Sequence, residues 1–353
     1  MVVGMNIPDR EGRKDEASAT ENITESIRRE KTLTRVHKRL SKQVEILERE
    51  ALAPHERVNN ASKGKREDTG RPSFVEALRL LKRLNLKTYK QFNIVEPILE
   101  LYPKPQARKF ALSHGIRVPK IYGMWRRLED IPWEVLPARF VIKSSHGGGG
   151  ISVFPVERRG QNYYDFITSR TITADQMIKE LRLKHRAEAT YFAEELLTRP
   201  DGNAHKLPDD IKVFCFYGEI GFIEVRAEDG SRNPDSRPRA RFYLPTGAEV
   251  RSLPRPLMSM GRDLSPVSDL DYVLEAASKL SRSIMRPFAR IDFFSTNRGA
   301  VFGEITQNPG HTPLLVTNWD TRIGKHFDNA LGRILDELRD VGELDVQFGN
   351  QDE

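Results

Sequence analysis

The sequence predicts an α+β protein in which helices are mixed with antiparallel β-hairpins. Two pairs of apolar runs each meet at a short turn, one at Tyr217-Gly218-Glu219 and one at residues 296–299, which is typical of hairpins. Amphipathic helical patterns surround them, without the regular strand–helix–strand alternation of a parallel sheet. The chain of 353 residues exceeds the usual size of one domain, so we expect two domains or one large unit with an appendage.

Residues 1–72 differ from the rest of the chain because they contain no aromatic residue. Apolar residues from Ile23 to Ala51 recur at spacings of three, four and six, which predicts an amphipathic helix. Charges of both signs surround this stripe, and the flanking segments have the composition of a disordered leader and a linker. We expect either a solvated helix with some self-association or a dedicated partner-binding helix.

From Ser73 onward the patterns are those of a folded region. Residues 74–102 and 103–116 predict two helices, and residues 117–123 predict an extended segment. A short apolar strand over residues 138–143 ends at a lysine, and a second strand resumes at residue 151 after a glycine run. A helix within residues 173–189 and a strand over residues 190–197 complete this part.

The C-terminal part contains both hairpins. They cover residues 210–227 and 288–306, and an amphipathic helix over residues 269–284 separates them. Residues 324–344 predict a closing helix. We find no internal repeat at a fixed period.

Composition and charge exclude several classes of protein. The single cysteine, Cys215, rules out an internal disulfide framework and a cysteine-built zinc site. No apolar run is long enough for a membrane span, and the N-terminus lacks a signal-peptide pattern, so we expect a cytoplasmic protein. The net charge of +7 is spread along the chain, which argues against nucleic-acid binding and favours placed cations at an anionic site.

A glycine-rich segment joins the strands over residues 138–143 and 151–156. It reads Ser-Ser-His-Gly-Gly-Gly-Gly and follows Lys143 directly. Consecutive glycines let backbone amides approach an anion closely, and the lysine adds a fixed positive charge, so the segment predicts a phosphate-binding lid. A flexible surface hairpin is the alternative. His146 on its own is expected to be a hydrogen-bonding loop residue.

The second hairpin carries Arg290, Asp292 and Glu304. The strand register can bring both carboxylates to one face, where they repel each other unless a cation neutralises them. Mg²⁺ binds one or two carboxylates together with substrate phosphates, so the pattern predicts a carboxylate–magnesium–phosphate site. The alternative is that each acid is an exposed strand residue paired with a lysine or arginine.

These segments, in this order, resemble the ATP-grasp superfamily. The block ARIDFF...VFGEITQNPGHT is similar to the Arg-Ile-Asp and Glu-x-Asn-x-x-Pro-Gly-x-Thr pattern of D-alanine:D-alanine ligases. The sequence also resembles the teichuronopeptide-biosynthesis (TupA-like) branch, which is found with polysaccharide gene clusters. The segments that carry this resemblance are FVIKSSHGGG, DIKVF and FGEIT. The resemblance covers about residues 74–335 and implies an ATP-grasp fold, with two α+β lobes clasping ATP after a charged N-terminal helix. The implied division is a leader (1–72), a helical region (73–137), lobe 1 with the lid (138–197) and lobe 2 (198–353).

The resemblance also implies ATP and Mg²⁺ as cofactors and assigns roles to individual residues. The expected ATP-phosphate and lid residues are Lys104, Lys143, His146, Gly147, Gly148, Gly149 and Gly150. Glu194, Glu195, Leu196 and Leu197 would line the adenine, mostly through backbone groups. Lys212 would reach a terminal phosphate, Arg290 would stabilise the tetrahedral adduct, and Asp292 and Glu304 would bridge Mg²⁺. Thr306 stands where the ligases have asparagine, so Thr306, Asn308 or water would complete the metal shell.

The implied activity is an ATP-dependent carboxylate–amine ligase that forms an amide through an acylphosphate. A uronic acid-type glycan and an amino acid are the expected substrates. Arg226, Arg241 and His311 are candidates for the acceptor pocket. A phosphotransferase on the same fold and a non-catalytic nucleotide-binding scaffold are the alternatives.

Overall fold

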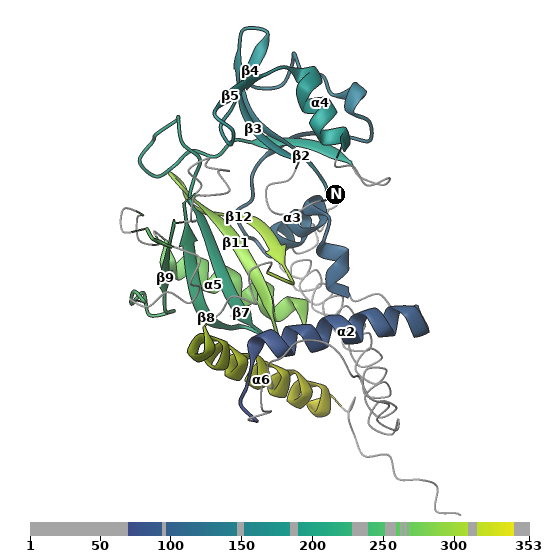
Figure 1. Cartoon of the computed structure of the whole chain (residues 1–353), viewed down its shortest axis with the longest axis vertical. Coiled ribbons are helices and arrows are strands. Elements are labelled where there is room, and N and C mark those ends of the chain that lie inside the picture. Colours follow the sequence, from purple (N-terminus) through teal and green to yellow (C-terminus); the bar gives the residue numbers. More distant parts are fainter. Residues whose placement is uncertain are drawn as a thin grey trace, which may run out of the picture. The chain divides into compact units, whose positions relative to one another are not determined.

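The computed structural model describes residues 70–93, 97–146, 152–183, 190–227, 239–250, 259–261, 264, 267, 269–309 and 316–341. Most of these residues belong to one unit, within residues 62–82 and 97–334, which contains both β-sheets (Figure 1). A second unit includes the described residues 83–93 and 335–341. The helix predicted over residues 23–51 and the lid glycines 147–150 lie outside the described residues.

The helices follow the predicted order. They are α2 (Phe74–Phe92), α3 (Lys104–Ser113), α4 (Ala174–Leu183), α5 (Leu270–Ile284) and α6 (Thr317–Asp340), with short 3₁₀ helices η1 (Pro97–Leu101) and η2 (Leu128–Asp130). The prediction of one helix over residues 74–102 is wrong. Helix α2 ends before Asn93, whose φ of 52° is left-handed, and Pro97 cannot donate the amide hydrogen that a continued helix needs.

The first sheet has the strand order β1-β6-β2-β3-β4-β5, and every neighbouring pair is antiparallel. Its strands are β1 (Ile121–Trp125), β2 (Arg139–Ser144), β3 (Val153–Arg159), β4 (Asn162–Asp165), β5 (Arg170–Ile172) and β6 (Tyr191–Glu195). Phe140 and Ile142 on β2 pack with Met177 and Leu181 on α4 in one buried cluster. Helix α4 therefore covers the apolar face of this sheet.

The second sheet has the order β10-β9-β8-β7-β11-β12. Its strands are β7 (Asp210–Phe216), β8 (Glu219–Arg226), β9 (Arg239–Tyr243), β10 (Ser259–Met260), β11 (Ala289–Thr296) and β12 (Gly299–Thr306). Both predicted hairpins form, β7–β8 and β11–β12, and β11 also pairs antiparallel with β7. The two hairpins thus join into one continuous sheet, and only the short β10–β9 pair in it is parallel.

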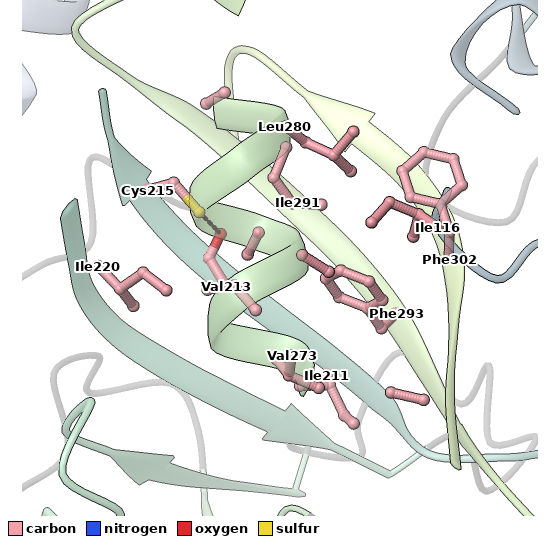
Figure 2. Close-up of a cluster of buried hydrophobic side chains, with 14 of the residues drawn as sticks. Ile116, Ile211, Val213, Cys215, Ile220, Val273, Leu280, Ile291, Phe293 and Phe302 are labelled. Atoms are coloured by element: carbon pink, nitrogen blue, oxygen red, sulfur yellow. Dashed lines mark hydrogen bonds between the residues drawn. The ribbon is translucent and has the colours of Figure 1, made fainter. Parts of the chain in front are cut away.

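One face of this sheet packs against α5. Val213, Ile291 and Phe293 from the strands meet Val273 and Leu280 from the helix in a buried cluster (Figure 2). Cys215 lies in the same cluster, where its thiol is close to the Val213 carbonyl oxygen at 3.4 Å. Because side chains alternate along a strand, the residues between these positions must face the other side of the sheet.

That other face has an apolar end and a charged end. At the apolar end, Phe214 stacks on Phe222 with ring centroids 4.0 Å apart, and Phe222 contacts Trp319 of α6. The aromatic packing continues from Phe216 to Phe288 and on to Phe74 of α2. The charged end carries the side chains of Asp210, Lys212, Glu224, Arg226, Arg290 and Asp292. No helix within the described ranges is long and apolar enough to cross a membrane.

Candidate active site

A row of four charged residues crosses the second sheet from β8 to β12. In the strand register Glu224 lies opposite Lys212, Lys212 opposite Asp292, and Asp292 opposite Glu304. Residues that are directly opposite in neighbouring antiparallel strands share a face and have Cβ atoms about 5 Å apart. The adjacency of Asp292 and Glu304, which the hairpin pattern predicts, is therefore present.

Asp292 is a buried carboxylate held by two cations. Arg290 donates to both of its oxygens, from Nε to Oδ1 at 2.7 Å and from Nη2 to Oδ2 at 2.5 Å, and Lys212 Nζ lies 3.4 Å from Oδ2. Burial on its own would raise the pKa of Asp292, but Arg290 and Lys212 outweigh it and hold the pKa below its usual range. Asp292 is consequently a preformed negative charge at neutral pH.

Lys212 is buried between carboxylates from two strands. Its Nζ forms ion pairs with Asp210 and Asp292. Burial opposes the charged form, but the two carboxylates outweigh it and raise the pKa of Lys212 to about 12. The lysine is a fixed cation, as a phosphate-binding role requires, and cannot serve as a general base near neutral pH.

Glu304 is the more open of the two paired acids, with 38% of its side chain exposed. Thr306 donates a hydrogen bond to Glu304 Oε1 at 3.3 Å and accepts one from Arg290 Nη2 at 2.9 Å. The threonine hydroxyl is thus part of the network that links both acids to Arg290. Asn308 lies beyond the end of β12 and is exposed.

Two more lysines, Lys143 and Lys104, interact electrostatically with each other, and Lys104 also interacts with Glu304 of this row. Lys143 at the end of β2 forms a buried ion pair with Glu194 of β6. Lys104 begins α3, and its backbone amide donates to the Ser145 carbonyl oxygen at 2.9 Å. Burial lowers the pKa of Lys104, an effect that Glu304 opposes and Lys143 reinforces. Lys104 therefore lies within electrostatic range of both the first sheet and the acid on β12.

The residues expected to line adenine have side chains that are already engaged. Glu195 accepts from Arg298 Nη2 at 2.7 Å, across to the β11–β12 turn, and from the Lys120 backbone amide at 3.2 Å. Leu197 is buried and Leu196 is half-buried. With Glu194 held by Lys143 and Glu195 by Arg298, polar contacts of this segment with a nucleotide base would depend on backbone groups.

His146 is a loop residue just before the lid glycines. One ring nitrogen, Nδ1, lies 2.8 Å from the Ser145 hydroxyl, and its ring centroid lies 5.8 Å from that of Tyr102. These contacts agree with the expected hydrogen-bonding role in the loop.

Two of the three residues suggested for an acceptor pocket, Arg226 and Arg241, lie on opposite faces of the second sheet. Arg226 lies on the charged face, whereas Arg241 is opposite Val225 in the register and so points to the other face. Arg241 forms a two-pronged pair with Glu249 at 3.0 and 2.8 Å. Arg226 and Arg241 are therefore separate candidates rather than parts of one pocket on this sheet, and His311 lies outside the described residues.

The sequence reasoning missed two acids of the charged face, Asp210 and Glu224. A signal was available, because each stands two residues before a cation on the same strand, Asp210 before Lys212 and Glu224 before Arg226. Residues i and i+2 of a strand share a face, so Asp210 could have been placed beside Lys212 and Glu224 beside Arg226.

The donor atoms fit Mg²⁺ and a nucleotide phosphate. Asp292, Glu304 and Thr306 offer only oxygen atoms, which hard divalent cations prefer, and Lys104, Lys143 and Lys212 supply positive charge around them. Among the described residues no group of three or more His, Cys, Asp or Glu side chains could hold a metal ion. A magnesium ion here would rely on the two acids and complete its shell with phosphate oxygens or water.

Comparison with known proteins gives one family and several structures of similar fold. The family model described as TupA-like ATPgrasp matches residues 82–335. The chain is similar to a D-alanine–D-alanine ligase from Bacillus anthracis, with 16% identity over 72% of this chain and 75% of that one (TM-score 0.43). It is also similar to the ATP-grasp ligase PsnB complexed with a minimal precursor, with 13% identity, 74% and 72% coverage and a TM-score of 0.38. A third, an L-amino acid ligase from Bacillus licheniformis, has 11% identity, 69% and 55% coverage and a TM-score of 0.42. No curated protein sequence gives a significant match.

Proposed function

The chain belongs to the TupA-like ATP-grasp family, and from this premise we propose that it is an ATP- and Mg²⁺-dependent carboxylate–amine ligase. The observation that carries the proposal is the direct pairing of Asp292 with Glu304 on a face that also holds Arg290 and Lys212. Two adjacent acids surrounded by fixed cations suit a metal-bound phosphate better than a neutral ligand.

The first half of the reaction is a phosphoryl transfer. An oxygen of the substrate carboxylate forms a bond to the γ-phosphorus of ATP, the bond to the β-phosphate oxygen breaks, and ADP leaves. Asp292 and Glu304 would hold Mg²⁺, and the bound ion would supply charge neutralisation at the phosphate oxygens. Lys104, Lys143 and Lys212 contribute further positive charge to the same oxygens.

The second half is an acyl transfer. The substrate amine attacks the acyl carbon of the acylphosphate, a C–N bond forms, and phosphate leaves as the amine loses a proton. Negative charge develops on the acyl oxygen in the tetrahedral adduct, and Arg290, which is hydrogen-bonded to Asp292 and Thr306, would stabilise it. The products are an amide, ADP and phosphate.

The substrates we propose are an acid and an amine, with a uronic acid-type glycan as the acid and an amino acid as the amine. The glycan follows from the resemblance to the polysaccharide-associated branch. The amine follows from the need to consume an acylphosphate, which water would otherwise hydrolyse.

A trapping experiment tests the proposed reaction. The full chain is incubated with ATP, Mg²⁺ and a panel of uronic acids, with hydroxylamine in place of the amine. We expect ADP release together with a hydroxamate, and at least about a hundredfold loss in Glu304→Ala and Lys143→Met. Glu76→Ala on α2, an exposed acid of the same type, is the matched control and should retain full activity.

Other outcomes would identify the alternatives. A phosphate ester without hydroxamate would indicate a phosphotransferase. Heat from ATP binding, with no ADP released for any acid of the panel, would indicate a non-catalytic nucleotide-binding protein. Unchanged hydroxamate formation in both variants would contradict the site.

A further inference from the structure

Arg226 ends β8 on the charged face, and the reaction described above does not use it. Its Nε and Nη2 both donate to Glu224 Oε1, at 3.0 and 2.6 Å. Glu224 is completely buried, and the Arg226 side chain is 20% exposed. Burying such an ion pair costs desolvation energy and seldom stabilises a fold better than apolar residues would, so the pair calls for a role other than packing.

The hydrogen bonds leave one edge of the guanidinium available. An arginine can bind a carboxylate in a two-pronged manner through its Nε–Nη2 edge or through its Nη1–Nη2 edge. Glu224 takes the first edge, and among the described residues no acceptor is paired with Nη1. Glu224 therefore acts as a buried support that fixes the direction of the second edge.

The position of Arg226 sets it apart from the metal-binding acids. In the register Arg226 lies opposite Asp210 on β7, and β7 lies between β8 and β11, so two strand spacings separate Arg226 from the strand of Asp292. At about 4.8 Å per spacing this is roughly 10 Å, much more than a metal–oxygen or phosphate contact. Arg226 still interacts electrostatically with Arg290, so it belongs to the same face.

We propose that Arg226, held by Glu224, binds a carboxylate of a substrate that does not itself react. This inference rests on the proposed ligase function. It narrows the substrate class to molecules with an anionic group two to three strand spacings, roughly 10–14 Å, from the strands of the metal-binding acids. That group is either the α-carboxylate of an amino acid that supplies the amine or a second carboxylate on the acid substrate.

A binding experiment with paired probes separates the two sources. The full chain, with Mg²⁺ and a non-hydrolysable ATP analogue, is mixed with L-alanine or L-alaninamide, and separately with succinate or succinamate. Binding is followed by saturation-transfer NMR of the small molecules. We expect at least one of the two carboxylate probes to bind tenfold or more better than its amide partner, and the pair that shows this difference identifies the source.

Three variants connect this selectivity to Arg226. In the double variant Arg226→Gln with Glu224→Gln, no buried charge is left unpaired, and the preference for the carboxylate probe should disappear. Arg226→Lys keeps the charge but loses the two-pronged geometry, so it should retain only part of the preference. Arg241→Gln is the matched control, because it removes an arginine–glutamate pair from the opposite face, and it should leave the preference intact.

The signals of the ATP analogue report on the nucleotide site in the same samples. If the analogue binds and the double variant keeps the probe preference of wild type, the proposed role of Arg226 is wrong. The same follows if the analogue binds to wild type but no probe does. Neither result contradicts the proposed ligase function. Failure of the analogue to bind wild type would overturn the proposed function, and this inference with it.

Discussion

Asp292 and Glu304 are opposite each other in the sheet but contribute differently to stability. Asp292 neutralises Arg290 and Lys212 in a buried position, so Asp292→Ala removes the bidentate partner of Arg290 and leaves Lys212 with Asp210 alone. We expect the free energy of unfolding to fall by about 3–5 kcal/mol. Glu304 is partly exposed, so Glu304→Ala should change it by less than about 1 kcal/mol. Urea denaturation of the metal-free protein measures both, and equal losses would contradict the assigned environments.

Lys212 predicts a stability change at alkaline pH. Its pKa is raised from the ordinary 10.5 to about 12 in the folded state, so its ion pairs contribute fully below pH 10.5. Their contribution declines as the pH rises from 10.5 through about 12, by roughly 2 kcal/mol in total. The stability difference between wild type and Lys212→Met, measured without metal, should therefore be larger at pH 9 than at pH 11.5. A pH-independent difference would contradict the predicted shift.

The candidate site shows which side-chain contacts can be predicted from the sequence. Asp292 and Glu304 were predictable because a tight turn fixes the register of their hairpin. Glu224 and Asp210 were not placed, because nothing local indicates that β7 pairs with β11 across some 70 residues of chain. The side-chain partners of Glu194 and Glu195 come from other strands and turns, Lys143 and Arg298, and sequence reasoning predicted neither pair.

At the scale of the element, the β11–β12 turn depends on Gly299. Its φ is +88°, and a Cβ there would lie 2.3 Å from Arg117 Nη1 and 2.4 Å from Asp269 Oδ2. Gly299→Ala therefore combines backbone strain with disruption of the Arg117–Asp269 ion pair. We expect the free energy of unfolding to fall by at least about 2 kcal/mol. Gly160 also has a positive φ, +65°, but no atom lies within 4 Å of its Cβ position.

Gly160→Ala is accordingly the matched control for the turn. Because only backbone strain is added, we expect Gly160→Ala to lower the free energy of unfolding by roughly 1 kcal/mol. Thermal unfolding of the two variants side by side measures the difference. If Gly160→Ala were as destabilising as Gly299→Ala, the close approach of Arg117 and Asp269 to the turn would have no energetic role.

Elements with strong periodicity were predictable, and short or interrupted ones were not. Both hairpins and α5 are within a residue or two of their predicted bounds. The predicted closing helix starts at residue 324, whereas α6 starts at Thr317, because Trp319 and Ile323 already face the core in its first turns. Strands β4 and β5, of four and three residues, are too short to show an alternation.

At the scale of the molecule, the α+β class and the ATP-grasp fold were both predictable from sequence. The chain has two antiparallel sheets with helices on them, and the family match spans residues 82–335. The fold class followed from hairpins without βαβ regularity, whereas the joining of both hairpins into one sheet requires long-range pairing that local patterns do not encode. Part of the excess of lysine and arginine over acidic residues lies at the candidate site, where the cations are Lys104, Lys143, Lys212 and Arg290.

The central claim is that the Asp292–Glu304 pair holds the metal of a nucleotide phosphate, and calorimetric titration with ATP tests it directly. Wild type should bind ATP at least tenfold more tightly with Mg²⁺ than with EDTA. Glu304→Ala, which keeps the fold, should lose this metal dependence, while Glu76→Ala should retain it. If Glu304→Ala bound ATP with the same affinity and the same dependence on Mg²⁺ as wild type, the acids on β11 and β12 would not be the metal site.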